Sequence, residues 1–234
     1  MRDVLILVPG LLCDGVVWGH QVDTLSARHD VRVADLRHVD SIAGMAASIL
    51  DAAPPRFSIA GHSMGARVAL EVVRRAPDRV ERLALFDTGI HPVQPGERAK
   101  RQDLIDLGRL YGMRALAASW LPPMVAPDRL DNDPVLRDAL FAMVERMTPD
   151  IHLNHITALL GRPDAQAALA AVRCPVLVGV GSEDRWSPPA QHRAIADALS
   201  GARLVVFEGA GHMAPMEAPE AVTAALADWM ATTA

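Results

Sequence analysis

Short apolar runs alternate along the chain with segments of helical pattern. Strands are expected at residues 4–8, 31–35, 57–60, 80–86, 176–180 and 202–207. These runs are continuously apolar rather than alternating, which is typical of parallel strands covered on both faces. Helices are expected at residues 41–53, 63–75, 189–199 and 219–230. Strands that alternate with helices indicate a parallel sheet joined by right-handed crossovers.

Residues 91–170 interrupt this alternation. They contain several prolines, many Met, Ala and Leu residues, and no good strand pattern. Stretches such as RQDLIDLGRLYGMRALAASWL and PVLRDALFAMVERM have helical patterns instead. We therefore predict that residues 1–90 and 171–234 form an α/β core, and that residues 91–170 form a helical cap inserted between two strands of one sheet.

Composition narrows the classes of function. The 234 residues are half hydrophobic, with a formal net charge of −5, so one large core is expected and neither nucleic acid nor an anionic membrane is an expected partner. Cys13 and Cys174 form no disulfide framework or metal motif. His152 and His155 are the only close pair of histidines and lack a third ligand, so no metal is expected. The apolar run at residues 4–8 is too short for a signal peptide or a membrane span, so a cytoplasmic location is expected. The sequence leaves the oligomeric state open.

The stretch Gly61-His62-Ser63-Met64-Gly65 lies between an expected strand and an expected helix. This is the pattern of a nucleophile elbow, a sharp turn that exposes a serine hydroxyl. Glycines two residues before and after the serine avoid clashes with the neighbouring strand and helix. The alternative is that Ser63 only caps the helix. The flanking elements favour the nucleophile.

A serine nucleophile needs a general base and a carboxylate that orients the base. In elbow proteins these partners follow the serine in the order acid, then histidine, and they lie at the carboxyl ends of strands. His212 follows the last expected strand and is the candidate base. Asp184 follows the strand at 176–180 and is the preferred acid. Asp87 and Glu183 remain alternatives.

The other histidines are not expected to act as the base. The sharp turn at Ser63 should aim the side chain of His62 elsewhere. Three histidines lie in or beside the insertion and are interpreted as polar residues of the cap: His91, His152 and His155. Four more are interpreted as surface residues: His20, His29, His38 and His192.

Acyl transfer also needs two donors for the oxyanion. One is normally the backbone N–H of the residue after the nucleophile, here Met64. The other comes from the loop after the first strand, VPGLLCDG, where Gly10 permits a close turn and Leu11 offers its N–H. Leu12 is the fallback donor. Cys13 is interpreted as a small buried apolar residue.

Four stretches resemble the α/β-hydrolase-fold superfamily, in its serine carboxylesterase-like branch. They are VPGLLCDGVVW, GHSMGARVALEVVRRAPDRVERLALFD, VGSEDRWSPP and GAGHMAPMEAPEAV, and they span nearly all of the chain except the insertion. The resemblance implies a triad of Ser63, Asp184 and His212, oxyanion donors at Leu11 and Met64, a helical cap and no cofactor. Because the chain begins at the first central strand, we expect a mostly parallel six-stranded sheet flanked by helices, without the family's leading hairpin.

Two details bear on the branch of the family. Pro9-Gly10 stands where many members have His-Gly. The chain is also similar to the menaquinone-pathway synthase of this fold, which carries Ser-x-Gly-Gly-Arg where this chain has Ser63 to Arg67. In that synthase the arginine contacts a substrate carboxylate. Here we interpret Arg67 as structural, with substrate contact as the alternative.

The expected function is hydrolysis of a small to medium, largely apolar carboxylic ester through an acyl-enzyme. The predicted pocket is apolar, which favours an uncharged ester over a sugar or phosphate. Its predicted lining consists of Leu12, Trp120, Met124, Trp186 and Met213. Two alternatives stay open: a lyase or synthase that uses the triad as a base, and a small-molecule receptor that retains the triad.

Overall fold

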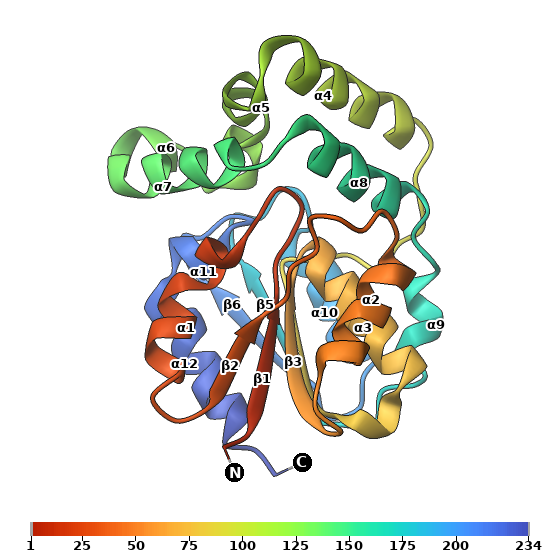
Figure 1. Ribbon diagram of the computed structural model, residues 1–234. Helices are drawn as coiled ribbons and strands as arrows, with labels where there is room; N and C mark the ends of the chain where they lie inside the picture. The colour runs from red at the N-terminus through yellow and green to blue at the C-terminus, as the bar shows by residue number, and fades with distance from the viewer. Residues whose placement is uncertain (1, 234) are drawn as a thin grey trace.

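A single six-stranded sheet runs through the computed structural model, which describes residues 2–233 (Figure 1). The strand order is β2-β1-β3-β4-β5-β6 and every neighbouring pair is parallel. The strands are β1 (Val4–Val8), β2 (Asp30–Val33), β3 (Phe57–His62), β4 (Val80–Phe86), β5 (Val176–Gly181) and β6 (Arg203–Phe207). The predicted six-stranded sheet is confirmed, and the expected strands are all present, with ends that shift by at most two residues.

Burial along the strands explains their continuous apolar patterns. Strands β3 and β5 are buried along their whole length, and β1 is buried from Leu5 to Val8. The edge strand β2 is half-buried to exposed, and β6 is mostly half-buried. A central parallel strand has helices on both faces, so most of its positions are apolar.

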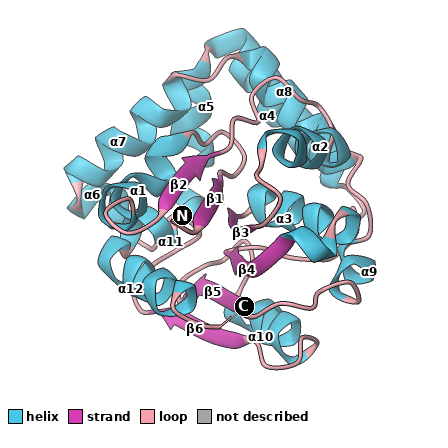
Figure 2. Cartoon of the chain, turned by 60° about the horizontal axis from the view of Figure 1, so that its bottom comes forward, coloured by secondary structure: helices cyan, strands magenta, loops and turns pink. Residues whose placement is uncertain are grey.

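Helices cover the sheet in two layers (Figures 1 and 2). Helices α1 (Gly19–Leu25) and α12 (Pro219–Met230) lie on one face, and α2 (Ile42–Ala52), α3 (Met64–Arg75) and α10 (Pro189–Asp197) lie on the other. The Ser41 hydroxyl caps α2 by accepting the Gly44 N–H at 3.2 Å. Helix α1 is only seven residues long and was not predicted from the sequence.

The segment between β4 and β5 is helical and lies over the carboxyl ends of the strands (Figure 1). It contains α4 (Glu97–Tyr111), α5 (Met113–Trp120), α6 (Arg129–Asn132), α7 (Pro134–Glu145), α8 (Pro149–Leu160) and α9 (Ala165–Leu169). Helix α9 packs beside α3 of the sheet layer rather than over the strand ends. Short 3₁₀ turns occur at Gly15–Trp18, Pro77–Arg79 and Pro122–Met124, and Ala214–Glu217 forms the one-turn helix α11.

The strand order reverses next to β1. The chain leaves β1 for the edge strand β2 and then returns to β3 on the other side of β1. The register pairs Val8 with Gly61, so the loops that follow β1 and β3 leave the sheet side by side. Parallel α/β sheets bind their ligands at such a reversal. None of the helices among residues 2–233 has the length and apolar character to cross a membrane.

Candidate active site

Ser63 lies on a sharp turn between β3 and α3. Its backbone has φ 55° and ψ −114°, in a region that residues with a side chain seldom occupy. A Cβ atom added at Gly61 would clash with the backbone of Gly65, and one added at Gly65 would clash with the Val8 carbonyl. Both positions therefore require glycine. The Ser63 N–H donates to the Phe86 carbonyl at 2.9 Å, which fixes the turn against β4.

Ser63, His212 and Asp184 form a continuous chain of hydrogen bonds. Ser63 Oγ lies 2.8 Å from His212 Nε2, and His212 Nδ1 lies 2.8 Å from Asp184 Oδ2. His212 and Asp184 are buried, whereas Ser63 is partly exposed. This geometry allows the imidazole to take the serine proton while the carboxylate fixes its tautomer.

Asp184 is held in place by the loop that follows it. Its carboxylate accepts the N–H groups of Trp186 and Ser187 and the Ser187 hydroxyl, each at 2.8 Å. Burial raises the pKa of Asp184, but His212 and Ser187 outweigh this effect and leave its pKa below the ordinary value. Asp184 is thus suited to remain a carboxylate beside His212.

Asp87, the alternative acid, occupies a different environment. It is fully buried at the end of β4, and its Oδ1 accepts the Gly181 N–H at 2.9 Å. Its Oδ2 has no hydrogen-bond partner among the described residues and lies 4.0 Å from His62 Nε2. Burial and the neighbouring Asp184 raise the pKa of Asp87 well above the ordinary value. The carboxylate that meets His212 is therefore that of Asp184.

Two of the expectations about histidines are wrong. His62 does not point away from the site: its Nε2 donates to the His212 carbonyl at 2.7 Å, and the two rings lie 5.5 Å apart between centroids. His192 is not a surface residue but is fully buried, and its Nε2 accepts the Thr88 N–H at 2.8 Å. The Thr88 hydroxyl in turn donates to the Ser63 carbonyl at 3.0 Å. Both histidines thus hold the backbone of the site: His62 bonds to the His212 carbonyl, and His192 bonds to Thr88, which in turn bonds to the Ser63 carbonyl.

Buried His62 and His192 also differ from ordinary histidines in their titration. Burial lowers the pKa of His62 to about 3, with a further contribution from His212. Burial likewise lowers the pKa of His192 to about 4. Each ring is therefore neutral near pH 7. His62 carries its proton on Nε2, and the unprotonated Nε2 of His192 can accept the Thr88 N–H.

The two predicted oxyanion donors lie on the neighbouring loops. Met64 is the first residue of α3, so its N–H has no acceptor within the helix. In the loop after β1, the Cys13 N–H donates to Gly10 O at 3.2 Å and the Leu12 N–H donates to His155 Nδ1 at 3.3 Å. These bonds leave Leu11, rather than the fallback Leu12, with an N–H available in this loop.

The residues predicted to contact substrate differ in exposure. Four of them are buried: Leu12, Trp120, Met124 and Met213. Trp186 is 54% exposed, so its side chain lies largely in solvent. A cavity of about 420 Å³ lies beside the oxyanion loop and is lined by residues 13–16 and 33–37, none of which was predicted to contact substrate. The five substrate contacts stay predictions.

Two residues that hold the triad were not predicted from the sequence. Ser187 follows Asp184 by three residues, the spacing at which a side-chain oxygen caps a turn, and this spacing was a usable signal. Glu217 accepts the N–H groups of Gly211 at 2.9 Å, Met213 at 3.2 Å and Ala126 at 2.8 Å. It thereby ties the His212 loop to the segment above the sheet. Nothing local in the sequence indicated this contact, since Ala126 is 91 residues away.

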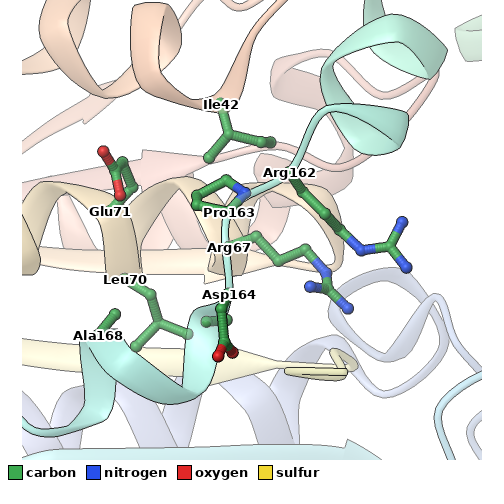
Figure 3. A pocket seen from close by; sticks show the side chains of 9 residues that line it. Ile42, Arg67, Leu70, Glu71, Arg162, Pro163, Asp164 and Ala168 are labelled. Atoms are coloured by element: carbon green, nitrogen blue, oxygen red, sulfur yellow. The ribbon is translucent and has the colours of Figure 1, made fainter. Parts of the chain in front are cut away.

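Arg67 lies at the edge of the helical segment. It is buried, its Nη2 donates to the His91 carbonyl at 3.1 Å, and no hydrogen bond joins it to Ser63, His212 or Asp184. Arg67 and Arg162 extend in the same direction beside a cavity of about 10 Å³, which is about the size of one water (Figure 3). Burial, together with the charge of Arg162, lowers the pKa of Arg67 to about 9. These surroundings support the structural interpretation of Arg67.

The described residues contain no group of three or more His, Cys, Asp or Glu side chains arranged to hold a metal ion.

A model of the alpha/beta hydrolase family matches residues 5–225. The chain is 28% identical to a putative carbamate hydrolase, RutD, from Caulobacter sp. strain K31, over 98% of this chain and 91% of that protein.

Two solved structures share the architecture and more than a quarter of the sequence. One is a thermophilic esterase from Thermogutta terrifontis with malate bound, at 28% identity and a TM-score of 0.88, covering 98% of this chain and 90% of that one. The other is the enol-lactonase of Burkholderia xenovorans LB400, at 26% identity and a TM-score of 0.90, covering 99% and 92%. The family match, the six-stranded parallel sheet and the likeness to these enzymes identify the chain as a hydrolase of the alpha/beta hydrolase family.

Proposed function

We propose that this protein is a serine hydrolase that cleaves a small to medium, largely apolar carboxylic ester through an acyl-enzyme. The observation that carries the proposal is the chain of 2.8 Å hydrogen bonds from Ser63 Oγ through His212 to Asp184. A serine hydroxyl is a weak nucleophile unless a positioned base removes its proton. A serine that merely caps a helix would have no use for such a base, and Ser63 makes no side-chain cap bond to α3.

The proposed reaction has two steps. His212 takes the Ser63 proton as Ser63 Oγ attacks the ester carbonyl carbon, and the N–H groups of Leu11 and Met64 hold the resulting oxyanion. His212 then gives the proton to the leaving alkoxide, and an acyl-Ser63 ester remains. Water, deprotonated by His212, attacks this ester in the second step, so that the acid is released and Ser63 regains its proton.

A second substrate class follows from one of the relatives. The carbamate hydrolase that matches 98% of this chain is named for a substrate that carries nitrogen on its carbonyl carbon. The esterase and the enol-lactonase are named for ester and lactone cleavage. The predicted apolar lining favours an uncharged substrate, and we place the ester first because both solved relatives are named for cleavage of an ester or a lactone. A panel of p-nitrophenyl esters, lactones and carbamates ranks these classes by kcat/KM.

Substitution of the nucleophile tests the proposal directly. Ser63→Ala should abolish turnover of short p-nitrophenyl esters and labelling by a fluorophosphonate, because no other hydroxyl of residues 2–233 bonds to His212 Nε2. Ser119→Ala, at an exposed position on α5, is the matched control and should leave both unchanged. Retained turnover in Ser63→Ala would sink the assignment.

Mass spectrometry separates the hydrolase from its rivals. A hydrolase should accumulate an acyl group on Ser63 when it is quenched during turnover of a slow ester. A lyase or synthase that uses the triad only as a base should show no such adduct. A receptor that retains the triad should bind its ligand with very slow turnover.

A further inference from the structure

The loop after β1 makes a turn that its sequence does not favour. The Cys13 N–H donates to Gly10 O, which closes a four-residue turn with Leu11 and Leu12 at its centre. Leu12 has φ 59° and is fully buried. A positive φ at the third residue is the mark of a type II turn, where glycine is strongly preferred. A leucine at this position would by itself favour the type I turn, in which the peptide between Leu11 and Leu12 is flipped.

A side chain from the cap helix α8 holds this turn. His155 is 1% exposed, and its Nδ1 accepts the Leu12 N–H at 3.3 Å across 143 residues of sequence. If the central peptide flipped to the type I orientation, the Leu11 carbonyl would face His155 and the Leu12 N–H would lose its acceptor. The bond therefore selects the orientation in which the turn is found.

The imidazole is suited to accept this bond. Burial lowers the pKa of His155 to about 4, although the Leu36 backbone and Asp35 partly oppose the shift. The ring is thus neutral near pH 7, with Nδ1 free to accept and the proton on Nε2. The neighbouring His152 is equally buried but makes no hydrogen bond with the described residues.

We propose that His155 is a positioning residue: by accepting the Leu12 N–H it holds the Leu11–Leu12 peptide, and with it the backbone of Leu11, whose N–H is the proposed oxyanion donor. It touches neither the substrate nor the reacting atoms. The inference rests on the proposed function, because it assumes that Leu11 is an oxyanion donor. It adds to that function a dependence of acyl transfer on a side chain of the cap.

A set of three substitutions tests the bond rather than the bulk of the ring. In His155→Asn the Oδ1 atom is attached to Cγ, as Nδ1 is in histidine, so it can accept the Leu12 N–H. In His155→Gln the amide lies one atom further out, near the position of Nε2. In His155→Leu there is no acceptor. His152→Leu, on the same helix and equally buried, is the matched control.

The readouts are kcat and KM for p-nitrophenyl butyrate and the rate constant for labelling of Ser63 by a fluorophosphonate. A displacement of about 1 Å in a catalytic group costs up to ~100-fold in rate, so kcat and the labelling rate should fall at least ~10-fold in the Leu and Gln variants. KM should change little. The Asn variant and His152→Leu should stay within about threefold of the native protein.

Thermal midpoints establish that each variant is folded. If the Leu variant does not fold, the comparison of Asn with Gln decides. Native rates in the Leu or Gln variant, or equal losses in Asn and Gln, would overturn the role of His155. Turnover that survives Ser63→Ala would instead overturn the proposed function itself, so the two failures are distinguishable.

Discussion

Ser63 is one of three residues that adopt positive φ angles at the carboxyl ends of neighbouring strands. Leu12 follows β1, Ser63 follows β3 and Asp87 follows β4, with φ values of 59°, 55° and 46°. Such conformations cost of order 1–3 kcal/mol each and persist only where the surroundings hold them. Here the Leu12 N–H donates to His155, the Ser63 N–H donates to the Phe86 carbonyl, and the Asp87 side chain accepts the Gly181 N–H. Backbone strain is thus concentrated at the proposed site.

The two buried aspartates give a test at the residue scale. Asp184→Asn should lower kcat/KM on a p-nitrophenyl ester on the order of 10⁴-fold, because an amide favours the wrong tautomer of His212. Asp87→Asn should stay within about tenfold, since its Oδ1 can still accept the Gly181 N–H. If Asp87→Asn alone were inactive, the acid would be Asp87.

At the scale of elements, a buried ion cluster joins the two ends of the helical segment. Arg162, just after α8, makes a bidentate pair with Glu97 of α4 at 2.7 and 2.8 Å, and Arg101 shares the same carboxylate at 2.8 Å. Arg162 also donates to the carbonyls of His91 and Pro92 in the segment that leaves β4. This cluster, which we call the cap clamp, ties the end of the segment to its beginning.

Removing one member of the cap clamp should be costly. Arg162→Met leaves Arg101 as the remaining arginine partner of the mostly buried Glu97 carboxylate. It should therefore lower the free energy of unfolding, measured by urea denaturation, by about 2–3 kcal/mol, less than the cost of leaving a buried charge unpaired. Arg146→Met is the control. It removes an ion pair between the helical segment and Asp14 of the loop after β1, in which the Arg146 side chain is 47% exposed. It should cost less than about 1 kcal/mol. Equal losses would contradict a special role for the cap clamp.

At the scale of the whole molecule, the fold buries several histidines in neutral form. Burial lowers the pKa of His62 to about 3 and the pKa values of His152, His155 and His192 to about 4. An unfolded histidine has a pKa of about 6.5, so below that pH the unfolded chain binds protons that the native protein does not. Asp87 and Glu217 act in the opposite sense, because burial raises their pKa values and the native state retains their protons.

The four histidines outnumber the two acids, so stability should fall as the pH drops from about 6.5 toward 4. Each histidine contributes a slope of up to about 1.4 kcal/mol per pH unit in this window and nothing above it. His152→Leu removes one such group without removing a hydrogen bond among the described residues. When the free energy of unfolding is measured by urea denaturation from pH 4 to 8, it should fall less steeply with decreasing pH in this variant than in the native protein. Parallel curves would count against a buried neutral His152.

Local patterns were sufficient for the strands and for the order of the site residues. The apolar runs predicted β1 and β4 to the residue, and the glycines around Ser63 predicted the elbow that the structure contains. Helix α1 was missed because a seven-residue helix has too few turns to show a period. His192 was misjudged because α10 has a mixed pattern, and a polar side chain gives no sign that it will be buried against Thr88.

The sequence by itself therefore determined the parallel sheet, the elbow and the candidates Ser63, Asp184 and His212, because the patterns that indicate them are local: apolar runs, glycine spacing, and residues that directly follow a strand. Only the tertiary structure decided which groups surround them. The contacts of His62 with the His212 carbonyl, of Glu217 with the Ala126 N–H and of His155 with the Leu12 N–H join residues 91 to 150 positions apart. Such contacts depend on how strands and helices pack, and no local pattern of residues encodes that packing.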